Sequence, residues 1–247
     1  MKKTSKHNSE PLAIALNHLS GRYVLPSFRR DYVWTMEQIE ELVNSIYRGY
    51  PPIGTLLLWR INSNGDSPLL NETFYQFLFH YHEEKSYRAE RKISLLPNVD
   101  YWVVLDGQQR LTSLNIGLLG SYSKKVPDQR KDNPDYQEYK LYMLISHDAE
   151  NPFKFLKLSD INTVSDIFID KAKGEKWLLV KRIFMADTAQ DLRRHFNLSS
   201  DEWHRVANFK DALDNLKIEF TEMTGFDYNE ATKVLSKSTI FASDSNL

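Results

Sequence analysis

The chain of 247 residues contains no cysteine. This absence excludes disulfide bonds, thiolate zinc sites, iron–sulfur clusters and cysteine nucleophiles from its chemistry. Three other motifs are also missing: Gly-x-x-x-x-Gly-Lys, His-Glu-x-x-His and Gly-x-Ser-x-Gly. The chain is therefore not a Walker-type NTPase, and it shows neither the helical zinc motif nor the serine nucleophile elbow.

Long apolar runs are missing too. The first ten residues are polar and only a short apolar stretch follows them, so no signal peptide is expected. The longest apolar runs, such as residues 53–59, are far shorter than a membrane span. These absences predict a cytoplasmic protein.

Neither sign of charge is in excess, since the formal net charge is −1. No global positive field therefore draws the chain to nucleic acid, and any DNA binding must come from a local patch or a partner domain. The 41% hydrophobic, 13% aromatic and 26% charged residues are typical of a folded globular protein.

The hydrophobic pattern predicts a mixed α/β (α+β) fold. Residues 53–59 and 101–105 are short, continuously apolar runs, which indicate buried strands. Thr35 and Gln38 have the spacing of a capping box and predict the start of a helix. Ser199 or Ser200 is expected to cap a later helix with an apolar stripe that includes Trp203.

The order of these elements suggests three regions. Residues 1–10 are expected to form a disordered tail, residues 11–158 a mixed core, and residues 159–247 a mostly helical extension. Within the core, residues 74–81 are interpreted as helical and residues 121–139 as a polar linker. Residues 140–146 and 153–158 are expected to pair as strands.

The sharpest local feature is a strand followed by Asp106-Gly107-Gln108-Gln109-Arg110 and a helix. The glycine allows a tight turn and close approach of a ligand, and the helix start offers free N–H groups to a phosphate. Arg110 can contact phosphate oxygens, and Asp106 can hold Mg²⁺. Gln108 and Gln109 could orient a water or contact a base. The alternative from spacing alone is an ordinary turn with a solvated arginine.

Residues 104–114 resemble the hallmark of the GmrSD-type restriction endonuclease N-terminal family. Two earlier segments, residues 25–34 and 45–59, resemble further family motifs in the same order. The resemblance implies a ParB/sulfiredoxin-like fold with a nucleotide site in the loop at residues 106–110. It also implies a Mg²⁺-dependent nucleoside-triphosphatase in phage defence, acting on DNA that is often modified. The implied partner is an HNH-type nuclease domain or subunit.

The resemblance assigns roles residue by residue. Catalysis is expected from Asp106, Gln108, Gln109 and Arg110, with Asp106 as the metal ligand. Nucleotide binding is expected from Arg30, Tyr32, Gly107, Arg110 and Thr112.

Two features depart from the family pattern. The family usually has glutamine where this chain has Arg29, and the extra charge either strengthens phosphate attraction or replaces a water-positioning amide. The family also continues into a segment with Asn-Gly-Gly, which residues 233–247 lack. The chain is therefore expected to be truncated, with an incomplete helical extension and no nuclease domain.

The remaining candidates are weaker. His80 and His82 would share a face only on a strand, and a helix at this place would separate them. The basic and aromatic residues 29–34 could bind single-stranded nucleic acid, but a core role for Tyr32 and Trp34 is favoured. The pairs at residues 124–125 and 193–194 are interpreted as solvated surface. A module that recognises DNA or a protein without catalysis therefore remains the alternative function.

Overall fold

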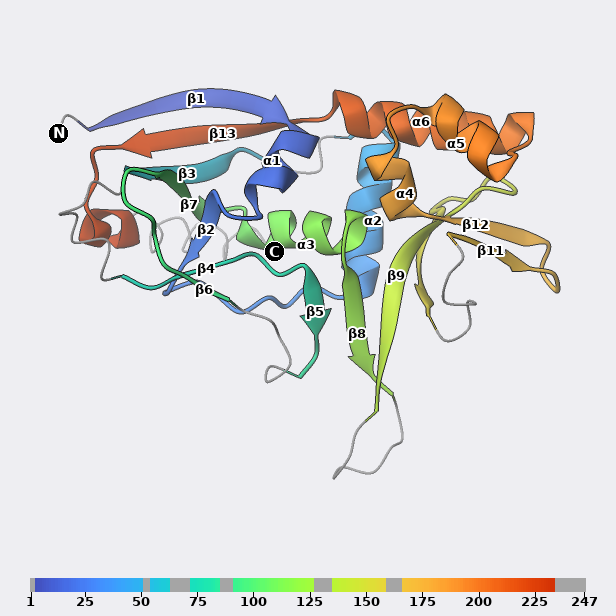
Figure 1. The fold of residues 1–247 in the computed structure, drawn as a ribbon, viewed down its shortest axis with the longest axis horizontal. Coiled ribbons are helices and arrows are strands. Elements are labelled where there is room, and N and C mark those ends of the chain that lie inside the picture. The colour runs from blue at the N-terminus through green and yellow to red at the C-terminus, as the bar shows by residue number, and fades with distance from the viewer. Residues whose placement is uncertain are drawn as a thin grey trace, which may run out of the picture.

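The computed structural model describes residues 3–50, 54–62, 72–84, 91–126, 135–158 and 166–233. It contains two mixed β-sheets that lie side by side, with helices between and above them (Figure 1). The structure therefore confirms the expected α+β class. No helix in the described residues is long and apolar enough to cross a membrane.

The first sheet has seven strands and carries the predicted buried strand at its centre. Tyr101, Val103 and Leu105 of this strand enter one apolar cluster, while Val104 enters the larger core. Burial of both faces explains the continuous apolar run. In order, the strands are β1 (Thr4–Pro11), β13 (Lys217–Thr224), β3 (Leu56–Asn62), β7 (Asp100–Asp106), β2 (Tyr23–Pro26), β4 (Phe74–Tyr75) and β6 (Lys92–Ile93).

The second sheet follows the order β11 (Ile167–Asp170), β12 (Glu175–Leu179), β9 (Tyr136–Leu144), β8 (Ser121–Lys125) and β5 (His80–His82), and β10 (Phe153–Lys157) pairs with β9. The antiparallel pairing of β9 with β10 confirms the strand pair expected there. In Figure 1, β8 and β9 extend together away from the body of the molecule.

The labelled helices are α1 (Leu12–His18), α2 (Met36–Tyr47), α3 (Gln108–Leu118), α4 (Val180–Met185), α5 (Ala189–Phe196) and α6 (Ser200–Asn215), and residues 228–233 are helical as well. Both predicted caps are present, since Thr35 and Ser199 each form a capping box with a side chain three residues later. Figure 1 shows α2 and α3 in the middle of the molecule, where the largest apolar cluster lies.

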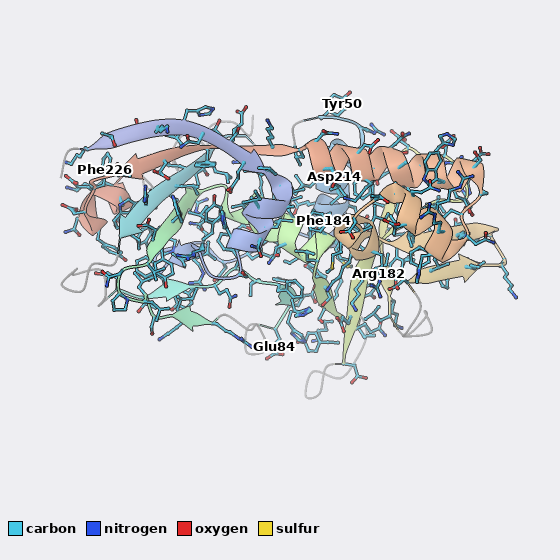
Figure 2. All side chains as sticks on the ribbon, turned by 45° about the horizontal axis from the view of Figure 1, so that its top comes forward. Tyr50, Glu84, Arg182, Phe184, Asp214 and Phe226 are labelled. Carbon is cyan, nitrogen blue, oxygen red and sulfur yellow. The ribbon has the colours of Figure 1, made fainter. Side chains whose placement is uncertain are left out.

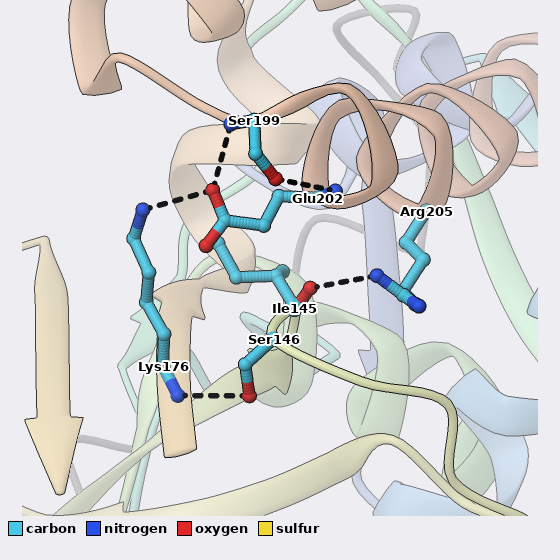
Figure 3. A network of polar contacts seen from close by, with 6 residues as sticks. All are labelled: Ile145, Ser146, Lys176, Ser199, Glu202 and Arg205. Carbon is cyan, nitrogen blue, oxygen red and sulfur yellow. Dashed lines mark hydrogen bonds and ion pairs between the residues drawn. The ribbon is translucent and has the colours of Figure 1, made fainter. Parts of the chain in front are cut away.

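A polar network joins the start of α6 to the second sheet (Figure 3). Glu202 accepts from the N–H of Ser199 and pairs with Nζ of Lys176 at 3.0 Å. Arg205, one turn later, donates to the carbonyl of Ile145 at 3.2 Å. Figure 2 gives the wider view: Arg182 of α4 lies toward this second sheet, Phe184 lies near the centre of the molecule, and Phe226 lies at the far end of the first sheet.

Several sequence expectations were wrong. The polar tail is largely strand, because β1 pairs along its whole length with β13. Residues 74–81 contain strands instead of a helix, and the expected linker supplies β8 and the start of β9. The C-terminal part includes three strands, and β13 returns to the first sheet in parallel with β3. Residues 234–247, on which most of the expected truncation rests, lie outside the described residues.

Candidate functional site

Gly107 forms the turn between β7 and α3. Its φ of +88° lies in the left-handed region, where glycine carries no Cβ penalty. No side chain caps the first turn of α3, and no acidic residue lies in that turn. The helix start therefore offers backbone N–H groups and a positive dipole end to an anion.

Asp106 and Arg110 lie on either side of this turn. The Asp106 side chain is 54% exposed and that of Arg110 28%, and Oδ2 of Asp106 is 3.9 Å from the nearer guanidinium nitrogen. The guanidinium also lies close to the Gly54 and Gly107 backbone, since a Cβ at Gly54 would be 3.1 Å from its Nη1. The two glycines thus leave room for the guanidinium beside the uncapped helix start, and Asp106 adds one weak ion pair.

Gln108 and Thr112 lie on another face of α3. The Gln108 amide donates to the carbonyl of Val104 at 2.7 Å, and the Thr112 hydroxyl donates to the carbonyl of Gln108 at 2.8 Å. Both side chains line a narrow cavity of about 20 Å³, which has room for a water molecule but not for a nucleotide. The lining residues are Leu25, Arg29, Arg30, Tyr32, Gln76, Leu78, Gln108, Gln109 and Thr112.

The segment at residues 29–34 closes one side of this cavity. The Gln109 amide donates to the carbonyl of Asp31 at 2.8 Å and accepts from the N–H of Val33 at 3.2 Å. Tyr32 is buried, and its hydroxyl lies 2.7 Å from that of Ser113. Burial raises the pKa of the Tyr32 phenol well above its ordinary value. The hydroxyl of Tyr32 is thus directed at α3.

The two arginines of this segment differ in their surroundings. The Arg29 guanidinium lies 3.8 Å from the centre of the Tyr75 ring, and Arg30 is exposed. Both line the cavity, while Trp34 packs against the main core. The core role favoured for Tyr32 and Trp34 is therefore confirmed, while the expectation that the arginines line a nucleotide pocket stays a prediction.

The predicted site residues lie in two places in the structure. Arg30, Tyr32 and Thr112 meet Gln108 and Gln109 at the cavity, whereas Asp106 and Arg110 lie at the open turn. Sequence reasoning missed Gln76, which lines the cavity, and Tyr75, the last residue of β4, on which Arg29 stacks. No local pattern marks them, because pairing between β2 and β4 brings them there.

The histidine pair does lie on a strand, contrary to expectation, but each ring has its own partner. His80 Nδ1 is 2.7 Å from the Ser121 hydroxyl, and burial lowers its pKa. The His82 ring accepts from the N–H of Glu84. Within the part of the chain that the structure describes, no group of three histidine or acidic side chains could hold a metal ion.

The residues at the turn nevertheless suit a Mg²⁺ ion that is bound partly by phosphate oxygens. It is commonly held by one or two carboxylates together with phosphate oxygens and waters. Asp106 provides one exposed carboxylate next to the uncapped helix start, so the donor set suits a metal that arrives with a phosphate.

Two comparisons with known proteins place the chain. An uncharacterized protein from Methanocaldococcus jannaschii is 31% identical over 131 residues, which are 53% of this chain but only 20% of that protein. The family model of the GmrSD restriction endonuclease N-terminal domain matches residues 13–243, from α1 to beyond β13. The chain therefore belongs to the N-terminal domain family of GmrSD restriction endonucleases.

Proposed function

We propose that this chain is a nucleoside-triphosphate-binding and -hydrolysing regulatory module, ParB/sulfiredoxin-like in fold, of a bacterial antiphage system that restricts modified DNA. The observation that carries the proposal is the uncapped start of α3 at Gly107, with Arg110 beside it. Free N–H groups and a guanidinium together form a site for phosphate oxygens.

Each residue then has a definite task. The N–H groups at the start of α3 and the guanidinium of Arg110 hold the phosphates, and Arg30, which lines the cavity beside Gln108, adds positive charge. Such charge stabilisation is the main contribution of a protein to phosphoryl transfer. Mg²⁺, held through Asp106, would neutralise phosphate charge when bound.

Hydrolysis requires one water in line with the terminal phosphorus. The water oxygen bonds to that phosphorus, the bridging P–O bond breaks, and the diphosphate leaves with its bonding electrons. One proton of the attacking water passes to a phosphate oxygen, and the other stays on the new P–OH group. Gln108 is the residue best placed to orient the water, because its side chain lines a cavity of water size.

The module would act with a nuclease. The matched region covers only a fifth of the Methanocaldococcus jannaschii relative, so the nuclease partner is part of the proposal. We expect an HNH-type nuclease domain or subunit as the partner, and contact with DNA through that partner or a local patch.

The proposal is tested by thermal unfolding with each of the four NTPs and Mg²⁺, on the wild-type chain and on Asp106→Ala. A ligand at 100 times its dissociation constant adds about 2.7 kcal/mol. This corresponds to a rise in Tm of roughly 5–10 °C for a chain of this size. A rise that the substitution abolishes supports the site, and the absence of any rise with all four NTPs contradicts it.

One observation favours the alternative, DNA recognition without catalysis. The Arg29 guanidinium stacks on the Tyr75 ring, and a second basic residue, Lys92, is the direct cross-strand partner of Tyr75. Aromatic and basic residues together suit a nucleic acid strand. Salt-dependent DNA binding that no nucleotide alters, and that Tyr75→Ala weakens, would select this function.

A further inference from the structure

The Gln109 side chain binds the backbone of the segment at residues 31–33 through both ends of its amide. Nε2 donates to the carbonyl of Asp31 at 2.8 Å, and Oε1 accepts from the N–H of Val33 at 3.2 Å. These contacts reproduce the paired donor and acceptor of a neighbouring β-strand. The amide is therefore engaged with protein backbone on both sides of Tyr32.

A second attachment lies one helical turn later. Ser113 follows Gln109 by four residues, so both side chains lie on one face of α3. The Ser113 hydroxyl is 2.7 Å from that of Tyr32, and both residues are buried. Three consecutive residues of the segment are thus attached to the helix that begins at the phosphate site.

The attached segment carries Arg30. Residues 29–35 form no helix or strand, so no ladder of backbone bonds fixes their position. Arg30 is exposed, yet it lines the same cavity as Gln108 and Thr112. The segment also contacts Pro26 and Tyr75 through Arg29 and Tyr122 through Trp34. The contacts of Gln109 and Tyr32 are those that attach it to α3, so they help to set the place of the Arg30 charge relative to this helix.

We propose that Gln109 is a positioning residue that holds the arginine segment on α3 and thereby places Arg30 beside the phosphate site. This inference rests on the proposed nucleotide function and replaces a water-orienting role for Gln109. A cation held in place before binding loses less conformational freedom when the phosphate arrives.

The attachment is tested first without any nucleotide, by amide hydrogen exchange. Val33 as a whole is 71% exposed and its N–H donates to Gln109, so we expect this bond, and not burial of the residue, to protect the N–H. Gln109→Ala should accelerate exchange at residues 31–33 and leave Leu114 in the middle of α3 unchanged. The matched control is Gln190→Ala, the same change on the exposed surface of α5. Unchanged exchange at residues 31–33 in Gln109→Ala would overturn the proposal.

A conservative variant gives a second test of the attachment. In Gln109→Glu the ionised carboxylate keeps an acceptor for Val33 but opposes the carbonyl of Asp31. Protonation of the new carboxyl group, near pH 4.3 for an ordinary glutamate, restores a donor. Protection relative to wild type should therefore recover as the pH is lowered, a profile that a merely space-filling role would not produce.

The positioning role itself is tested by a double-mutant cycle with Arg30→Ala, using Mg²⁺ complexes of the four NTPs as probes. Gln109→Ala should weaken binding by roughly 5- to 30-fold, the loss of one or two kcal/mol of attachment. In the Arg30→Ala background the same change should have little effect, because nothing remains to be positioned. Additive losses would overturn the positioning role. If no NTP binds any variant, the proposed function fails, and the exchange result still decides whether Gln109 holds the segment.

Discussion

Gly107 lies against Leu56 so closely that a Cβ on the glycine would be 2.1 Å from Cδ2 of the leucine. Leu56 belongs to the buried core and is 1% exposed, so a shift of its side chain would disturb the core packing. The φ of +88° at Gly107 adds a conformational requirement to this steric one. We therefore expect Gly107→Ala to destabilise the fold by more than the roughly 1–2 kcal/mol of left-handed strain alone.

Gly174 offers the matched control for this prediction. It also has a positive φ, +67°, but a Cβ there would meet no atom within 4 Å. Gly174→Ala therefore carries the strain without the clash. Urea unfolding of both variants measures the difference, and equal losses of stability would show that Leu56 does not restrict the turn.

Arg110 is expected to contribute to nucleotide affinity more than to folding. Its ion pair with Asp106, at 3.9 Å, is long and partly exposed to solvent, so it adds little stability. Arg110→Ala should weaken NTP binding by at least ~1.5 kcal/mol, the value of a lost charge-assisted bond. Calorimetric titration measures this change, and an unchanged affinity would contradict the role of Arg110.

Gly54 provides an independent route to the same arginine. A Cβ at Gly54 would be 3.1 Å from Nη1 of Arg110, so Gly54→Ala must shift the guanidinium and leave its charge intact. We expect reduced NTP affinity with little change in stability. Gly21→Ala, where a Cβ meets no atom within 4 Å, is the control.

The buried hydrogen bond between Tyr32 and Ser113 predicts a coupled pair. Either Tyr32→Phe or Ser113→Ala leaves one buried hydroxyl without its partner and should cost about 1–3 kcal/mol. The double variant removes both hydroxyls and should cost less than the sum of the two single losses. Chemical denaturation measures the coupling, with Tyr50→Phe as control, because Tyr50 is 64% exposed and extends from the surface (Figure 2).

Local patterns in the sequence predicted the elements that local interactions determine. The capping boxes at Thr35 and Ser199, the doubly buried β7 and the turn at Gly107 all depend on neighbours within a few residues. These features also define the start of α3, so the core of the candidate site followed from the motif.

Elements that depend on distant partners could not be predicted in this way. β1 is polar and mostly exposed, and it is a strand because β13 supplies its backbone partners. The contacts of Gln109 likewise join α3 to a segment about 77 positions earlier, with no periodic pattern to reveal them. Tertiary pairing therefore overrode the weak local signal at both places.

Glu40 predicts a specific pH dependence of stability. Its carboxylate accepts from the N–H of Phe155 at 2.7 Å, yet burial raises the pKa of Glu40 above its ordinary value of 4.5. Glu37 acts in the same direction, while Lys154 and the bond from Phe155 oppose it. The folded state thus holds this proton more tightly than the unfolded state does.

The sign of the effect follows from this difference. The stabilising contribution of protonated Glu40 is fully present below pH 4.5 and is lost as the pH rises through the raised pKa. Glu40→Gln keeps the acceptor for Phe155 and carries no charge to bury. The variant should therefore gain stability relative to wild type between pH 4.5 and neutral pH, as measured by urea unfolding across that range. Glu150→Gln, an exposed control, should show no such gain, and a constant difference between Glu40→Gln and wild type would mean that burial of the carboxylate carries no cost.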